Sequence, residues 1–158
     1  MADTEPRQMG FTEIKEWVRH RYPVNYLDRI TDWTPGESLT ALFNVSGSLP
    51  CLVGHFPERA ILPSSSTMMA FAQCGIVLYQ LSTRKLRDDE ITLMGNSTIS
   101  SRRILVPGDQ ITLHISCDRL RDNYLRFTGT AYVDGEVASR VRTSLIRKKV
   151  ADLGPQLW

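Results

Sequence analysis

The segment STMMAFAQCGIVLYQLS, residues 66–82, is apolar on nearly every side when it is wound as an α-helix. A helix without a polar face has no side to turn toward water, so it must be buried. We therefore expect residues 66–82 to form a helix in the core of the fold.

Most of the remaining chain has the pattern of β-strands. Leu39, Ala41, Phe43 and Val45 alternate with polar residues, as in a strand that is buried on one face. Further strand-like runs lie at residues 91–94, 99–106, 111–117, 124–133 and 137–146. Asp134-Gly135 suits a two-residue hairpin turn. Short turns between the late strands indicate a mostly antiparallel sheet, and the buried helix covers one face of it.

Length and composition predict one domain, residues 1–158, because the chain has 158 residues of which 42% are hydrophobic. Its ordered core is expected to span about 11–148, between flexible ends that include a tail at residues 151–158. At the start of this core Phe11, Ile14 and Val18 recur at helical spacing, which predicts a short amphipathic helix. This helix ends before Pro23, because the residue before a proline avoids helical geometry.

Composition and charge argue against several functions. The formal net charge of +2 is far from that of a dedicated nucleic-acid binder. The three cysteines show no CxxC spacing, which argues against a disulfide framework or a structural metal site. The sequence contains no glycine-rich phosphate loop, so we expect no cofactor. We find no apolar signal core and no run near the roughly 18 apolar residues of a membrane span. We expect a cytoplasmic protein with reduced thiols, without nucleic-acid or membrane partners.

Five motifs follow one another along the chain. They are IKEWVRHRYPVNYLDRI at residues 14–30, GHFPERAILP at 54–63, AFAQ at 70–73, RRILVPGDQ at 102–110 and FTGTAYVDGEVA at 127–138. In this order and spacing the sequence resembles the 3-hydroxyacyl-acyl-carrier-protein dehydratases of bacterial fatty-acid synthesis. The resemblance covers most of residues 14–140. It implies the α+β hot-dog fold, in which an antiparallel sheet wraps around one long buried helix.

The resemblance also implies a mechanism. Removing water from a 3-hydroxyacyl thioester requires a base for the proton beside the carbonyl, an acid for the departing hydroxyl and a donor for the enolate oxygen. In the family the histidine of GHFPG is the base, and a backbone N–H at the start of the buried helix polarises the carbonyl. These roles fall on His55 and Ser64. The motif residues that support the assignment are Gly54, Phe56, Pro57, Pro63 and Gln73.

The family's acid position falls on Met69, and methionine can neither donate a proton nor carry charge. In this family the histidine and the acid of one site belong to different subunits of a dimer. A homodimer of this chain would hold His55 twice and the acid nowhere, so we expect it to be weak or inactive. A homologous partner subunit that bears Glu or Asp would complete one site in each heterodimer.

Three functions are open at this point. The first is a subunit of a heteromeric dehydratase in fatty-acid or polyketide-type biosynthesis, acting on a thioester held by an acyl carrier protein. The second is a non-catalytic hot-dog protein that binds acyl chains or stabilises a partner enzyme. The third is an enoyl-thioester isomerase or a thioesterase, although residues 64–75 offer no carboxylate for hydrolysis.

Several other residues have more than one interpretation. Arg102 and Arg103 could dock an acidic carrier protein or could be solvated surface charge. The hydroxyls of residues 64–67 are expected to cap the helix, with replacement of the acid as the alternative. His20 and His114 are interpreted as structural, and Cys74 as a small buried hydrophobe.

Overall fold

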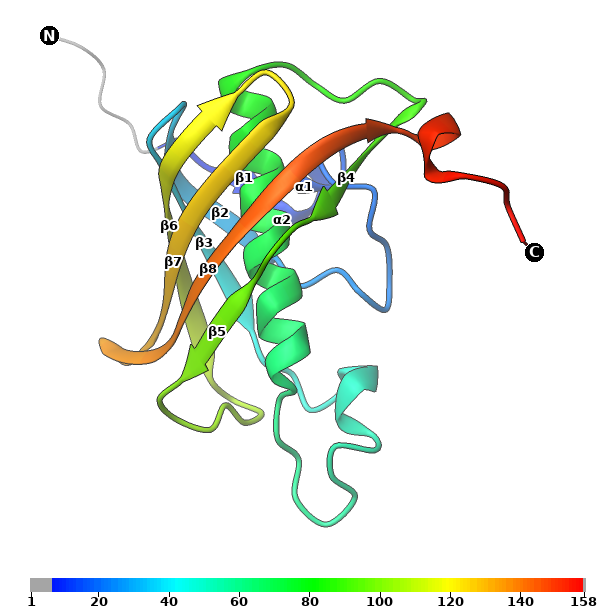
Figure 1. Ribbon diagram of the computed structural model, residues 1–158. Coiled ribbons are helices and arrows are strands. Elements are labelled where there is room, and N and C mark those ends of the chain that lie inside the picture. Colours follow the sequence, from blue (N-terminus) through cyan, green and yellow to red (C-terminus); the bar gives the residue numbers. More distant parts are fainter. Residues whose placement is uncertain (1–6, 158) are drawn as a thin grey trace, which may run out of the picture.

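A curled antiparallel sheet wraps around the long helix α2, Ser64–Ser82, in the computed structural model, which describes residues 7–157 (Figure 1). The strands run in the order β1-β2-β3-β6-β7-β8-β4, and β5 also pairs with β8. They are β1 (Met9–Gly10), β2 (Arg29–Thr34), β3 (Ser38–Asn44), β4 (Glu90–Met94), β5 (Thr98–Ser101), β6 (Gln110–Arg121), β7 (Tyr124–Val133) and β8 (Glu136–Lys149). The short helices are α1 (Phe11–Ile14), η1 (Pro50–Leu52) and η2 (Val150–Leu153).

The predicted arrangement of one buried helix inside an antiparallel sheet is confirmed. Helix α2 spans the predicted residues 66–82 and starts two residues earlier, and Phe71, Cys74 and Leu78 are fully buried in it. All paired strands are antiparallel. Asp134 and Gly135 form the hairpin turn between β7 and β8, with φ angles of 50° and 78°. These positive values are the ones that a tight hairpin turn requires.

Two predicted elements are shorter than expected. Helix α1 ends at Ile14, well before the predicted limit at Pro23, because the N–H groups of Glu16 and Trp17 bond to carbonyls three residues back, as in turns. Strand β5 ends at Ser101 rather than at residue 106. The N–H groups of Arg102 and Arg103 both donate to the carbonyl of Ala138, at 2.7 and 3.3 Å. Two consecutive donors on one acceptor break the alternation of a strand ladder, so the chain leaves the sheet.

Strands β1 and β2 were not predicted, because β2 has the sequence RITDWT and only Ile30 of it is fully buried. At the C-terminal end, η2 is followed by exposed irregular chain to residue 157. The predicted flexible start extends to about residue 11; residues 1–6 of it and residue 158 of the tail lie outside the described residues, and Met9–Gly10 form β1. No helix within residues 7–157 is long and apolar enough to cross a membrane.

Helix α2 lies very close to the sheet because two glycines make room for two aromatic rings. A Cβ atom added at Gly75 of α2 would lie 2.4 Å from the ring of Phe127 on β7. In the reverse direction, a Cβ atom at Gly129 of β7 would lie 2.7 Å from the ring of Phe71 on α2. Each ring therefore packs directly on the backbone of the other element.

Two glutamines of α2 form hydrogen bonds with backbone groups of the loops that cover the other side of the helix. Gln73 is 1% exposed; its Oε1 accepts from the N–H of Tyr26 at 3.1 Å and its Nε2 donates to the carbonyl of Val24 at 2.6 Å. One heptad later, Gln80 accepts from the N–H of Leu86 at 2.9 Å and donates to the carbonyl of Trp17. Buried backbone groups need such partners, so these glutamines hold both loops against the helix.

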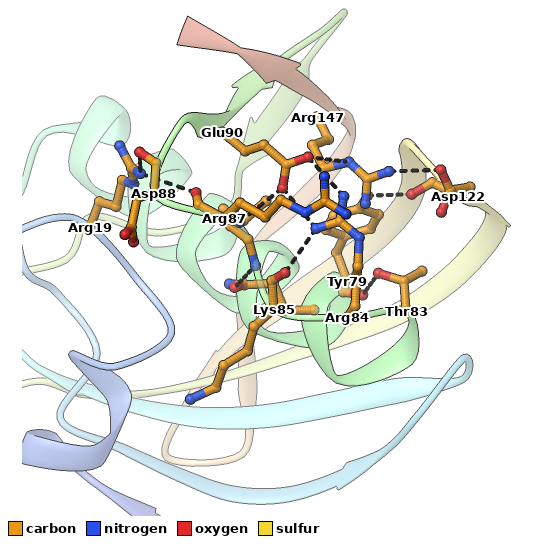
Figure 2. A network of polar contacts seen from close by, with 12 residues as sticks. Arg19, Tyr79, Thr83, Arg84, Lys85, Arg87, Asp88, Glu90, Asp122 and Arg147 are labelled. Atoms are coloured by element: carbon orange, nitrogen blue, oxygen red, sulfur yellow. Dashed lines mark hydrogen bonds and ion pairs between the residues drawn. The ribbon is translucent and has the colours of Figure 1, made fainter.

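A network of charged residues ties down the C-terminal end of α2 (Figure 2). Glu90, at the start of β4, is 4% exposed and accepts two hydrogen bonds of 2.7 Å from Arg84, just after the helix. Arg147 of β8 lies 3.6 Å from Glu90 and 2.7 Å from Asp122. The hydroxyl of Tyr79 in α2 donates to the carbonyl of Asp122. The network thus joins α2 to the chain around β4, to the β6–β7 turn and to β8.

Close packing at Gly129 predicts a stability loss on a small enlargement. We expect Gly129→Ala to lower the free energy of unfolding by about 1–3 kcal/mol, because the added methyl group overlaps the ring of Phe71. Urea denaturation monitored by circular dichroism measures this loss. Gly10→Ala is the control, since nothing lies within 4 Å of that Cβ position. Adding Phe71→Leu to Gly129→Ala should recover part of the loss, and a double variant with simply additive losses would contradict this explanation.

The ion pairs of Glu90 predict a pH-dependent contribution to stability. Its pKa is about 2, held down mainly by the hydrogen bonds from Arg84 and then by the N–H of Arg87. The unfolded value is near 4.5, so the stabilisation is present above that pH and is lost as the pH falls toward 2. We expect Glu90→Gln to lower the urea midpoint at neutral pH and to lower it progressively less as the solution is acidified through this range.

Asp122→Asn is the matched control for Glu90→Gln, because Asp122 contacts the same Arg147 but its side chain is 83% exposed. An exposed ion pair of this kind contributes little to stability, so the control should change the midpoint only slightly. An effect of Glu90→Gln that is equally large at neutral pH and at the acid end of the range would show that its carboxylate charge is not responsible.

Candidate active site

A cavity of about 560 Å³ lies at the N-terminal end of α2. Its walls come from the loop between β3 and α2, the first turn of α2, the chain after β5 and the beginning of β8. In Figure 1 the loop before α2 hangs below the start of the helix, and the end of β5 and the β7–β8 hairpin lie toward the same end of the molecule. The lining residues that matter for chemistry are Cys51, His55, Pro63, Ser64, Thr67, Ser101, Arg103 and Ser139. None of the described lining residues carries a carboxylate.

The ring of His55 is held by one hydrogen bond and one stacking contact. Its Nδ1 lies 2.8 Å from the carbonyl oxygen of Ile61, which can only accept, so Nδ1 carries the proton. The neutral ring then has its lone pair on Nε2. The ring of Phe56 stacks on that of His55 at 4.4 Å between centroids. The orientation of His55 therefore leaves a basic nitrogen in a residue that lines the cavity.

The first turn of α2 has unused backbone donors beside His55. The helix begins at Ser64 with Pro63 as its N-cap residue, and no side chain caps it. The expected capping by the hydroxyls of residues 64–67 is therefore wrong. The helix starts earlier than predicted, so these residues fill its first turn, and the Ser64 hydroxyl lies 3.3 Å from that of Ser101 instead. The N–H of Ser64 has no acceptor within the helix and is available to a ligand.

Met69 is not among the described residues that line the cavity with His55. Its side chain is half-buried and packs against the hydrophobic core from α2. The structure of one chain thus brings together His55 and Ser64 but not His55 and Met69.

The other predicted motif residues divide into two groups. Gly54, Phe56 and Pro57 lie in the exposed loop that presents His55, and Phe56 is 51% exposed. Gln73 lies away from the cavity and anchors a loop through its side-chain amide, as described above. Its place in the motif is explained by structure.

Of the two predicted docking residues, Arg103 lines the cavity and Arg102 is exposed next to it. Arg103 forms an ion pair of 3.2 Å with Asp109, whose carboxylate also accepts from the N–H of Val106 at 3.0 Å. This pair fixes the turn before β6. Among the ion pairs formed within residues 7–157, none involves Arg102.

His20, His114 and Cys74 lie outside the cavity. His114 contacts the hydroxyls of Thr40 and Ser116, at 3.0 and 3.4 Å, in the sheet. His20 lines a separate cavity of about 200 Å³, and burial followed by the charge of Arg21 lowers its pKa. Cys74 is fully buried, which raises the pKa of its thiol. All three cysteines are free, and within residues 7–157 no cluster of His, Cys, Asp or Glu could hold a metal ion.

Sequence reasoning missed three polar residues of the cavity, Cys51, Ser101 and Ser139. Cys51 lies four residues before His55, but nothing in that spacing indicates a shared cavity. The available signal for Ser139 was its position between Val137 and Val141, where the alternation predicts a buried apolar residue.

A curled antiparallel sheet that wraps around one helix defines the hot-dog fold. The cavity that His55 lines lies at the N-terminal end of that helix. Among solved structures the fold is similar to the dehydratase heterocomplex ApeI:P from Xenorhabdus doucetiae, with a TM-score of 0.76, 13% identity and coverage of 89% of this chain and 93% of that one. It is also similar to a hot-dog-like protein from Thermanaerovibrio acidaminovorans, with a TM-score of 0.58, 16% identity and coverage of 77% and 87%.

Sequence comparisons define the family. Residues 18–142 match the FabA-like domain, so the chain belongs to the FabA-like family. It is 46% identical over 160 residues to the coronafacic acid dehydratase of Pseudomonas savastanoi pv. glycinea, covering 99% of this chain and 97% of that protein. It is 35% identical over 142 residues to the 3-hydroxyacyl-[acyl-carrier-protein] dehydratase FabZ of Rickettsia massiliae, covering 89% and 98%. The predicted resemblance to the dehydratase family is confirmed.

The contact between His55 and Ile61 predicts the tautomer of the neutral ring. We expect nitrogen-15 NMR to show a protonated Nδ1 and an unprotonated Nε2 for His55, because the Ile61 carbonyl accepts from Nδ1. The spectrum of His55→Ala assigns the signals by their disappearance. A neutral ring protonated on Nε2 would contradict the assignment of the basic nitrogen.

Proposed function

We propose that this chain is a subunit of a 3-hydroxyacyl-carrier-protein dehydratase of fatty-acid or polyketide-type biosynthesis, with His55 as the base. The observation that carries the proposal is the single cavity that contains both His55, with its lone pair on Nε2, and the uncapped start of α2. The names of the relatives, a coronafacic acid dehydratase and a 3-hydroxyacyl-carrier-protein dehydratase, support dehydration as the reaction.

In the proposed reaction, Nε2 of His55 takes a proton from the carbon next to the thioester carbonyl. The electron pair of that C–H bond moves toward the carbonyl, and the N–H of Ser64 donates to the oxygen on which negative charge develops. The partial positive charge of the helix start adds to this stabilisation. A carbon–carbon double bond then forms as the bond from the next carbon to its hydroxyl breaks, and the hydroxyl leaves as water after taking a proton from an acid.

The acid is proposed to come from a second subunit. The described lining of the cavity has no carboxylate, and the resemblance to the family carries its acid position onto Met69. A homologous hot-dog subunit with Glu or Asp at the position equivalent to Met69 would supply the proton to the site that contains His55. The dehydratase heterocomplex ApeI:P, which has a similar fold, supports an assembly of this kind.

The proposed substrate is a 3-hydroxyacyl thioester on an acyl carrier protein, and Arg102 and Arg103 are its proposed contacts. Arg103 is already neutralised by Asp109, so the exposed Arg102 is the stronger candidate for attracting an acidic surface. Its position directly after β5, beside the cavity lining, suits a carrier that delivers its thioester there.

A second function, acyl binding or support of a partner enzyme without catalysis, is favoured by the same lack of a carboxylate. Under this alternative His55 makes no contribution to turnover. The two functions therefore differ in what happens when the missing acid is returned to the assembly and when His55 is removed from it.

An intersubunit complementation experiment tests the proposal. The wild-type chain has the base without the acid, and the double variant His55→Ala/Met69→Glu has a carboxylate without the base. If the two chains carry different tags and are purified together, each mixed dimer holds one site with both groups. We expect it to remove water from 3-hydroxybutyryl carrier protein at least about 100-fold faster than either chain alone, as general acid–base catalysis allows. Mass spectrometry measures the loss of water.

The matched control pairs His55→Ala with the same double variant, so that no base is present in any site. It should be as slow as the separate chains. Dehydration by the wild-type chain alone at the rate of the mixed dimer would place the acid elsewhere and overturn the role of position 69. A mixed dimer that binds the thioester but does not dehydrate it would favour the non-catalytic function.

A further inference from the structure

Ser139 has a buried hydroxyl group without a hydrogen-bond partner. The residue is 1% exposed, and its Oγ finds no partner among residues 7–157. Buried hydroxyl groups are normally paired, because removing one from water without compensation is unfavourable. Ser139 also lines the cavity that contains His55. Because the described residues offer this hydroxyl no partner, a ligand in the cavity is a candidate for that partner.

The position of Ser139 in the sheet explains why it is buried. Its neighbours on the same face of β8 are the buried residues Val141, Thr143 and Leu145. One residue earlier, a β-bulge between β7 and β8 leaves Ala138 without an opposite residue, since Ala131 pairs with Ser139 and Tyr132 pairs with Val137. As a result both Ala138 and Ser139 are buried and line the cavity, whereas regular alternation would turn one of them outward.

The other buried hydroxyl on this face of β8 behaves differently. The hydroxyl of Thr143 lies 2.5 Å from that of Ser97, so its hydrogen bond is complete inside the protein. Thr143 is not among the described residues that line the cavity. The hydroxyl of Thr143 thus has a partner within the protein, whereas that of Ser139 has none among the described residues.

Ser139 is also part of a row of hydroxyls that reaches the start of α2. It is the register partner of Ser101 on β5, and the hydroxyl of Ser101 lies 3.3 Å from that of Ser64. All three serines line the cavity with His55. The cavity therefore has hydrogen-bonding groups on the wall formed by β5 and β8 as well as at the helix start.

We infer that Ser139 is a substrate-binding residue whose hydroxyl hydrogen-bonds to a polar oxygen or nitrogen of the acyl thioester. Two parts of such a substrate carry suitable atoms, the 3-hydroxyacyl group and the amides of the pantetheine arm. The inference rests on the proposed function, because it takes the ligand of the cavity to be the thioester. It assigns Ser139 to recognition, whereas proton transfer belongs to His55.

Equilibrium binding to the whole wild-type chain tests this role without requiring turnover. The probes are 3-hydroxybutyryl-pantetheine and butyryl-pantetheine, which differ only in the 3-hydroxyl group, and mass spectrometry checks that neither is converted. We expect Ser139→Ala to raise the Kd by about three- to tenfold, the factor that one neutral hydrogen bond supplies. A loss seen only with 3-hydroxybutyryl-pantetheine assigns the contact to the acyl hydroxyl, and an equal loss with both probes assigns it to a group that they share, the thioester carbonyl or the pantetheine arm.

Thermal unfolding separates recognition from a structural role. We expect Ser139→Ala to leave the Tm unchanged or slightly raised, because it removes a buried polar group that has no partner in the protein. Thr143→Val is the matched control, since it removes a hydroxyl on the same face that is already paired. It should lower the Tm and leave both Kd values unchanged.

The outcomes distinguish the inference from the proposal on which it rests. If the wild-type chain binds the probes and Ser139→Ala binds them equally well, the role of Ser139 is overturned and the dehydratase proposal stands. If Ser139→Ala lowers the Tm as Thr143→Val does and leaves the Kd values unchanged, Ser139 is structural. If the wild-type chain binds neither probe, the role of Ser139 is overturned, and the complementation experiment with the mixed dimer decides the dehydratase proposal separately.

Discussion

The direct contact between α2 and the sheet is the constraint on which the rest of the structure depends. Gly75 and Gly129 remove the side chains that would otherwise separate the two elements, and Phe127 and Phe71 fill the space on either side. This contact fixes the depth of the helix inside the sheet. The start of α2 is thereby placed beside the end of β5 and the beginning of β8, where the cavity forms. The geometry of the site is therefore a consequence of packing several turns away from it.

The elements that follow a simple hydrophobic pattern could be predicted from the sequence. The residues of α2 are apolar all round, and β7 alternates over its whole length, so burial alone decides their structure. Strand β2 could not be predicted, because it buries little beyond Ile30 and is held by pairing with β3. The early end of β5 was equally hidden. It depends on which carbonyl accepts from Arg102 and Arg103, and that acceptor lies far away in the sequence.

The site could be predicted only where a motif is contiguous in the sequence. His55 and Ser64 lie in one short segment, so their shared cavity agrees with the expectation. Ser101 and Ser139 reach the same cavity through a strand pairing and a β-bulge. The local alternation indicates only that Ser139 is buried, and it does not reveal the pairing that brings it to the cavity. The prediction that the hydroxyls of residues 64–67 cap the helix was wrong for a related reason. The serines after Pro63 were judged by residue type, whereas their position in the first turn, set by where the helix begins, decides which bonds they form.

The two ends of α2 are held differently. Charged residues tie down the C-terminal end, whereas the N-terminal end has no side-chain cap and lies beside the cavity. A helix of 19 residues is about 28 Å long, so the charged network around Glu90 and the cavity around His55 are separated by most of the width of the domain. Substitutions that reshape one end have few shared partners with the other, and such changes combine nearly additively. Substitutions on the first turns of α2 can thus accumulate without weakening the anchor of the helix. The lining of the cavity and the stability of the helix can therefore change independently in this fold.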